Sequence, residues 1–197
     1  MSRVLLLAPV LAFGIALAGP VPGAQAGLLP VSVSINPEAD KYRWTYAIVL
    51  PTDAMIRAGD YFTIYDFAGL VAGSESQPAD WVFATVKSGG VPAGVNPQDD
   101  PELPNLIWTY SGPEVTSGQI GLGNFWAVSD HGTATDSFFT ARTHRTSDGL
   151  VDTNITPTTV PVPTASPPPG VPEPATLALA GLGLPLIGLY RRMRWSK

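Results

Sequence analysis

The chain has 197 residues, about one domain's length, and carries 20 glycines, 21 prolines, no cysteine and a formal net charge of −5. This acidic balance argues against a nucleic-acid-binding protein, because binding a phosphate backbone requires a basic surface. The lack of cysteine excludes disulfide scaffolds, thiolate zinc sites and cysteine nucleophiles.

The first 26 residues have the pattern of a secretory signal peptide. Arg3 precedes an apolar run at residues 4–18, and the glycines and prolines of residues 19–23 then break any helix. Ala24 and Ala26 supply the small residues of an A-x-A cleavage site. We therefore expect export by a Sec-type machinery and cleavage after Ala26, which makes Gly27 the first residue of the mature chain.

Residues 27–155 predict an all-β ectodomain. Apolar and polar residues alternate along the candidate strands, and no window shows an apolar stripe of helical period. Turn residues separate seven candidate strands, at residues 31–35, 42–50, 61–67, 81–87, 106–110, 119–129 and 137–146. This spacing favours an antiparallel β-sandwich, either Ig-like or jelly-roll in general shape.

The ectodomain offers few residues for catalysis. His131 follows a candidate strand and is expected in a turn, whereas His144 shares a strand face with Thr140 and Arg142 and is expected to be solvated. A triad of Ser129, Asp136 and either histidine lacks a nucleophile-elbow sequence. We expect no catalytic residue, no metal and no cofactor, which leaves a secreted hydrolase as the least favoured function.

Two groups of side chains raise the question of binding. The loop that holds Asp99, Asp100 and Glu102 lacks the order and the glycine of an EF-hand, so a solvated loop is favoured over a metal site. The sequence Asn154-Ile155-Thr156 fits the N-glycosylation triplet, a weak pattern by itself. The ectodomain tryptophans are expected in the core, with carbohydrate platforms as the alternative: Trp44, Trp81, Trp108 and Trp126.

Residues 156–170 predict a linker. Eight prolines lie between Pro157 and Pro174. Their fixed φ angles and missing N–H groups exclude a helix or a sheet ladder and predict an extended, polyproline-like spacer.

Residues 171–197 end in an apolar span followed by positive charge. Residues 175–190 carry no charge, and Arg191, Arg192 and Arg194 follow them. A helix of this length spans about 24 Å, and snorkelling arginines extend its reach toward the roughly 30 Å of a hydrocarbon core. We expect a single transmembrane helix with its C-terminus in the cytoplasm, and a buried helix of the ectodomain is the alternative.

The tail places the run Val171-Pro172-Glu173-Pro174 before the apolar span and the arginines, and this order resembles the PEP-CTERM sorting signal. Proteins of that family are exported by Gram-negative bacteria that make exopolysaccharide. The resemblance implies that a membrane enzyme, exosortase, recognises residues 172–174, and that the arginines act as a stop signal. It also implies transient residence in the inner membrane.

The function implied is that of a non-enzymatic cell-surface or extracellular-matrix protein of a biofilm. An exopolysaccharide-binding module is the alternative.

Overall fold

The structure, a computed structural model, describes residues 27–116 and 119–164, and its regular elements there are all strands. Within these ranges there is no helix of the length and apolar character that a membrane span requires. The strands are β1 (Leu29–Glu38), β2 (Lys41–Leu50), β3 (Ala54–Ile56), β4 (Tyr61–Ile64), β5 (Trp81–Val86), β6 (Asn105–Tyr110), β7 (Val115–Thr116), β8 (Ile120–Ser129), β9 (Thr133–Arg145) and β10 (Val151–Val162).

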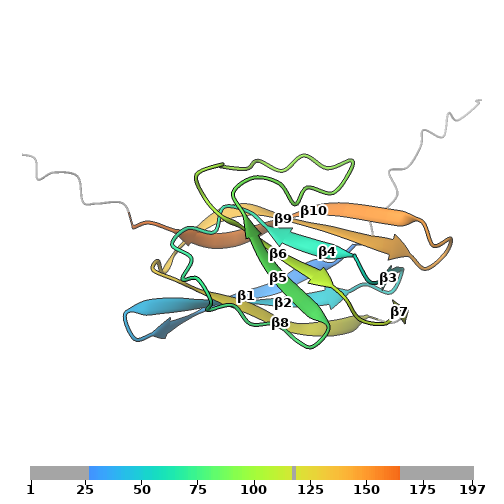
Figure 1. The fold of residues 1–197 in the computed structure, drawn as a ribbon, viewed down its shortest axis with the longest axis horizontal. Coiled ribbons are helices and arrows are strands. Elements are labelled where there is room, and N and C mark those ends of the chain that lie inside the picture. Colours follow the sequence, from blue (N-terminus) through green and yellow to red (C-terminus); the bar gives the residue numbers. More distant parts are fainter. Residues whose placement is uncertain (1–26, 117–118, 165–197) are drawn as a thin grey trace, which may run out of the picture.

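The strands form two antiparallel sheets, as expected for a β-sandwich. The smaller sheet has the order β1-β2-β8. The larger sheet has the order β5-β6-β4-β9-β3-β7, and β10 pairs with the other side of β9. In Figure 1 the smaller sheet runs along the lower side of the molecule, with β9 and β10 above it and β5 crossing in front.

The core lies between the sheets and follows from the alternation seen in the sequence. In β2 every second side chain, from Trp44 to Leu50, is buried. Phe62 of β4 stands at the centre, with its ring centroid 4.9 Å from Phe125 of β8 and 5.3 Å from Phe139 of β9. Aromatic pairs at this spacing add to the burial energy, so this cluster holds the two sheets together.

All seven candidate strands are present, and the structure adds β3, β7 and β10. The strand expected at residues 61–67 ends at Ile64. It ends there because Asp66 adopts a positive φ of 60°, which turns the chain out of the extended conformation.

Strand β10 corrects the predicted linker boundary, since residues 156–162 pair with β9 instead of beginning a spacer. The prolines fit because they lie four residues apart on an edge strand, with their ring nitrogens turned away from β9. The Pro161 carbonyl accepts from the Ala68 N–H, and the Thr159 carbonyl accepts from the Tyr46 hydroxyl. The backbone of these odd-numbered residues therefore faces away from β9, where a missing N–H breaks no ladder bond.

Candidate functional site

The residues predicted to carry sorting and processing lie outside the described ranges. They are Ala24 and Ala26 of the cleavage site, Val171, Pro172, Glu173 and Pro174 of the motif, and Arg191, Arg192 and Arg194 of the basic cluster. What the structure does describe are the two points where these segments join the sandwich. Gly27 is buried, and Thr164 follows the end of β10.

His144 is not solvated as expected but forms part of a cluster around a buried carboxylate. Its Nδ1 lies 2.9 Å from Asp60 Oδ2, and its side chain is 13% exposed, whereas that of Asp60 is fully buried. The Arg142 guanidinium donates to Asp60 Oδ1 over 3.1 Å, and the Arg57 backbone N–H donates to Oδ2. An ionised carboxylate only accepts, so Nδ1 carries the hydrogen. The cluster satisfies a buried charge.

The imagined triad does not assemble. The Ser129 hydroxyl donates to the Ala68 carbonyl over 2.7 Å and accepts from the His131 N–H, so its hydrogen is not available to an imidazole. His131 lies in the connection between β8 and β9, as predicted, and its carbonyl accepts from the Trp44 indole. Asp136 lies elsewhere, beside a pocket on β9.

The acidic loop, residues 99–102, contacts the sandwich through the Asp66 carboxylate. The Asp100 N–H donates to Asp66 Oδ1 over 2.8 Å, and the Ser137 hydroxyl donates to Oδ2 over 3.2 Å. Burial raises the pKa of Asp66, these two hydrogen bonds oppose the rise, and the charges of Asp99 and Asp100 add to it. No group of three or more His, Asp or Glu within residues 27–116 and 119–164 is placed to hold a metal ion.

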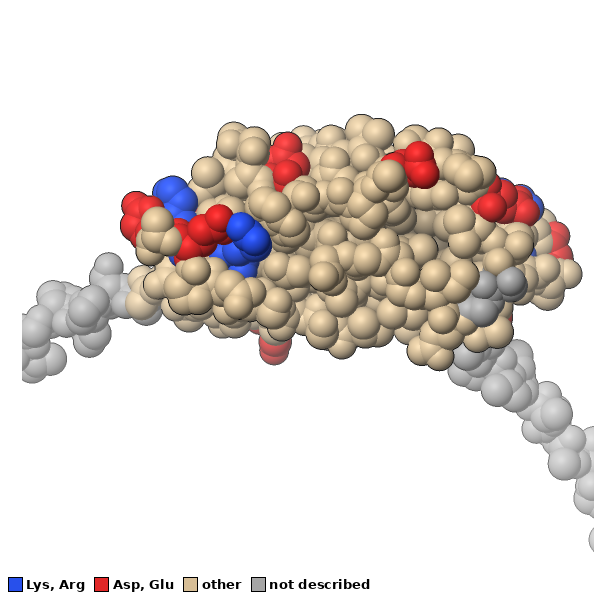
Figure 2. All heavy atoms as spheres, turned by 90° about the horizontal axis from the view of Figure 1, so that it is seen from below, with Lys and Arg blue, Asp and Glu red and all other residues tan. Residues whose placement is uncertain are grey.

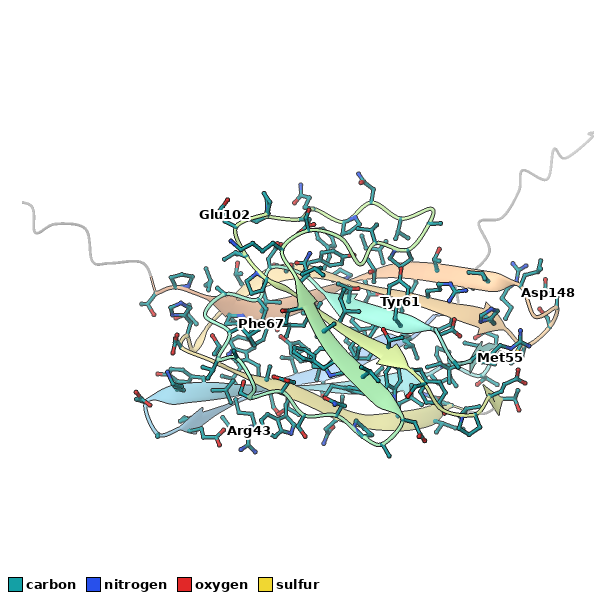
Figure 3. All side chains as sticks on the ribbon, viewed as in Figure 1. Arg43, Met55, Tyr61, Phe67, Glu102 and Asp148 are labelled. Atoms are coloured by element: carbon teal, nitrogen blue, oxygen red, sulfur yellow. The ribbon has the colours of Figure 1, made fainter. Side chains whose placement is uncertain are left out.

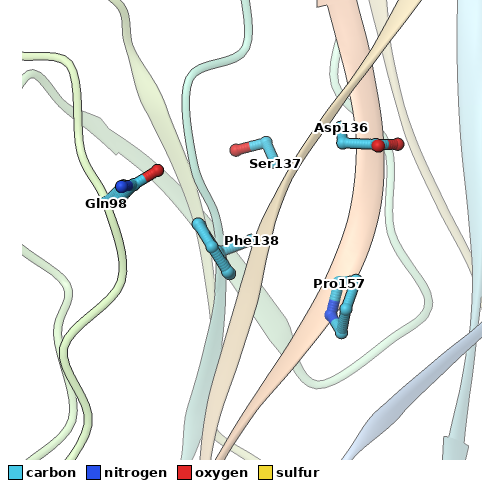
Figure 4. A pocket seen from close by; sticks show the side chains of 5 residues that line it. All are labelled: Gln98, Asp136, Ser137, Phe138 and Pro157. Atoms are coloured by element: carbon cyan, nitrogen blue, oxygen red, sulfur yellow. The ribbon is translucent and has the colours of Figure 1, made fainter.

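A pocket of about 360 Å³ opens between the loop that connects β5 to β6 and the strands β9 and β10. Figure 4 shows Gln98 on one side, Asp136 and Pro157 on the other, and the Phe138 ring between them. The Ser137 hydroxyl at the edge of the pocket donates its hydrogen to the Tyr65 carbonyl and the Asp66 carboxylate. The exposed surface of the pocket is mostly apolar, and none of the described histidines lines it.

The prediction that the tryptophans pack in the core is confirmed for three of the four. Trp44 and Trp108 are fully buried, and Trp81 is 7% exposed. Trp126, on the outer face of β8, is half-buried, and the Arg43 guanidinium lies 4.3 Å from its ring centroid. Arg43 therefore covers one face of the ring and competes with a sugar for stacking there.

Charged side chains occupy the margins of the sandwich. Figure 2 shows them near both ends of one face, while its middle is mostly uncharged. In Figure 3 Arg43 and Asp148 lie toward opposite ends of the molecule, and Glu102 lies on the loop above the sheets. The ion pairs at these ends are exposed, such as Lys41 with Asp130 and Arg145 with Asp148. Exposed pairs contribute little to stability and form no binding site by themselves.

Sequence reasoning missed Asp60 and Asp66 as the centres of the polar clusters. Each is a lone aspartate at an end of β4, and its partners come from strands and loops distant in the chain. The sequence held one indication of these clusters, which was that two aspartates flank an apolar strand. Aspartates in solvated turns produce the same pattern, so it could not identify the clusters.

Residues 170–194 match the family model of the PEP-CTERM protein-sorting motif. The matched range holds the Pro172–Pro174 motif and all three arginines of the basic cluster, so the resemblance seen in the sequence is confirmed. Such a motif indicates an exported protein that an exosortase sorts to the cell surface. No curated protein matches the chain.

Proposed function

We propose that the chain, which carries a PEP-CTERM motif at residues 170–194, is an exported, non-enzymatic β-sandwich that an exosortase processes at the inner membrane and delivers to the cell surface. The observation that carries the proposal is the order of the tail: acidic motif, uncharged span, arginines. An N-terminal signal peptide starts export, and the span at residues 175–190 holds the chain in the membrane until processing.

The chemistry of the tail supports this order of events. Flanking prolines favour an extended conformation at Glu173, and in the proposed topology a cationic pocket of the enzyme binds its carboxylate outside the bilayer. The arginines hold the far end of the span on the cytoplasmic side. Glycine and proline within the span lower its helix propensity, which suits a temporary anchor.

The described sandwich supports a non-enzymatic role. The hydroxyls of Ser129 and Ser137 donate to backbone carbonyls, and His144 is bonded to the carboxylate of Asp60. The polar groups that could act as nucleophile or base are thus used to hold loops and strands in place.

Intact-mass analysis of the secreted protein tests the proposal. In a cell that has an exosortase we expect the mature chain to end near residue 174, without the span and the arginines. The Glu173→Gln variant should accumulate at full length in the membrane fraction, because it loses the charge that the enzyme binds. Glu102→Gln, an exposed acid on the ectodomain loop, is the matched control and should be processed normally. Recovery of secreted chain that still contains Trp195 would contradict the proposal.

Polysaccharide binding by the sandwich is a second candidate, and the partly exposed Trp126 is the feature in its favour. Trp126→Ala should then weaken retention of the protein on the producing strain's exopolysaccharide in a pull-down assay. The matched control is Val82→Ala, which removes an exposed apolar side chain from the other sheet. Equal retention of all three proteins would remove this candidate.

A further inference from the structure

One buried amide in the sandwich has a hydrogen-bonding group without a partner. Asn154 of β10 is 3% exposed. Its Nδ2 donates to the Leu28 carbonyl over 2.9 Å and to the Thr156 hydroxyl over 3.2 Å, but its Oδ1 accepts no hydrogen bond. A buried acceptor without a partner destabilises the folded state, so a donor close to this oxygen would stabilise it.

The backbone beside this oxygen belongs to Gly27. A Cβ built on Gly27 would lie 1.9 Å from Asn154 Oδ1 and 2.5 Å from its Cγ, so no larger residue fits there without a shift. The next residue, Leu28, is fully buried in the core. The α-carbon of Gly27 is thus held against the amide, and its nitrogen is one covalent bond away from that carbon.

Cleavage after Ala26 changes the chemistry of this nitrogen. In the uncut chain it is a peptide nitrogen with a single hydrogen, whose direction the planar peptide dictates. Hydrolysis adds the hydroxyl of water to the Ala26 carbonyl carbon and the hydrogen to the Gly27 nitrogen. The product is an α-amino group that carries up to three hydrogens and rotates freely about its bond to the α-carbon.

We propose that Asn154 is the binding site for the α-amino group of the mature chain, with Oδ1 accepting from Gly27 while Nδ2 holds the Leu28 carbonyl. The proposal rests on export with cleavage after Ala26, as part of the proposed function. The Asn154 side chain then forms hydrogen bonds with both Gly27 and Leu28, the first two residues of the mature chain. A hydrogen bond from a charged donor is about twice as strong as a neutral one, so the cut stabilises the fold.

The site has a structural consequence for the edge of the sandwich. Among the described strands, β1 pairs only with β2 and β10 only with β9, so the Gly27–Asn154 contact joins the edges of the two sheets. The adjoining hydrogen bond from Asn154 to the Leu28 carbonyl spans 126 positions in the sequence. Removal of the signal peptide therefore completes the junction between the first and last strands of the ectodomain.

Labelling of the amino terminus tests the proposal on the full chain expressed in an exporting bacterium. N-terminal sequencing first identifies the mature terminus, which we expect to be Gly27. An amine-reactive ester at pH 7 then labels the α-amino group, whose pKa of about 8 lies well below the roughly 10.4 of lysine. Exposed Lys87 is the internal control for reagent and fold. We expect the bound amino group to react about tenfold more slowly than in the Asn154→Ala variant.

Two further variants separate binding from folding. Asn154→Asp and Asn154→Ala both lose the bond to the Leu28 carbonyl, but only the aspartate keeps an acceptor, so it should retain slow labelling. Gly27→Ala leaves Asn154 intact and pushes the terminus away, so labelling should become fast while Lys87 reacts as before. Equal labelling rates in wild type, Asn154→Ala and Gly27→Ala would overturn the proposal, as would a mature chain that begins at another residue. Exosortase processing is assessed separately, from the C-terminal mass.

Discussion

Two aspartates flank the central strand β4, and the sandwich treats them in opposite ways. Asp60 precedes Tyr61 and is fully buried, with Arg142 and His144 on its two oxygens. Asp66 follows the strand, is half-buried, and has Asp99 and Asp100 as its charged neighbours. In Figure 3 Tyr61 and Phe67 mark these two ends of β4.

The comparison shows that depth of burial does not by itself decide how a charge is accommodated. The deeper carboxylate is bonded to the Arg142 guanidinium and the His144 imidazole of β9, and the shallower one is held by neutral donors, the Asp100 N–H and the Ser137 hydroxyl. Because Asp60 is buried, the start of β4 depends for its stability on the bonds to Arg142 and His144. Because Asp66 lies beside the acidic loop that holds Asp99 and Asp100, the stability of the other end of β4 depends on pH.

The largest effect is expected at the paired end. Asp60→Ala leaves Arg142, His144 and the Arg57 N–H without their acceptor, and should lower the free energy of unfolding by about 3 kcal/mol. The estimate takes the low end of the usual range because Arg142 is 33% exposed. Urea denaturation followed by tryptophan fluorescence measures it. A loss no larger than that of an exposed-acid variant would show that the pairing is not needed.

A smaller effect is expected beside the other end, where Tyr65 is fully buried. Its hydroxyl donates to the Gly90 carbonyl over 3.0 Å and contacts the Thr140 hydroxyl, so Tyr65→Phe should cost about 1 kcal/mol. Burial raises the pKa of Tyr65 to about 12. A raised folded-state value stabilises the protein below the ordinary pKa of 10, and this contribution is lost as pH rises through about 12.

Thermal melts from pH 9 to 12 should therefore show a smaller alkaline loss in Tyr65→Phe than in wild type. Parallel curves for the two proteins would contradict the assignment to this hydroxyl.

A change of opposite sign is expected at Asp66. Its raised pKa means that its contribution to stability is complete below the ordinary value of 3.8 and is lost as pH rises through the raised value. Asp66→Asn should therefore raise the melting temperature at pH 7 by about 1–2 °C, a figure reduced for solvent screening at a half-exposed group. Asparagine also suits the positive φ, an effect present at every pH.

Melting temperatures at pH 3 and pH 7 separate these causes, because the electrostatic gain should disappear at the lower pH. A gain of the same size at both pH values would assign it to the backbone instead.

The smallest effect is expected at an exposed pair that resembles the Asp60 cluster in composition only. The Arg145 guanidinium holds the pKa of Asp148 below its ordinary value through a hydrogen bond of 2.7 Å, but both side chains are exposed. Asp148→Ala should leave the urea midpoint unchanged in physiological salt. A clear shift of the midpoint would mean that the β9–β10 turn depends on this pair.

Much of the fold was predictable because strand patterns are local. The alternation in residues 42–50 indicates a strand with one buried face, whichever strands it pairs with. Strand β2 has the expected bounds within one residue. Strand β10 was missed because proline content argues against a ladder, and only its position at a sheet edge makes Pro157 and Pro161 acceptable. His144 was misjudged because its partner, Asp60, lies 84 positions away.

The sequence by itself determined the sorting tail, because motif, span and arginines are contiguous and act through their order and charge. It also determined the all-β class, since period-two alternation needs no knowledge of neighbours. Only the tertiary structure decided which aspartate meets Arg142 and His144 and which amide meets Gly27. Those contacts join residues from distant strands, and long-range pairing brings them together only once the sheets have closed around a common core.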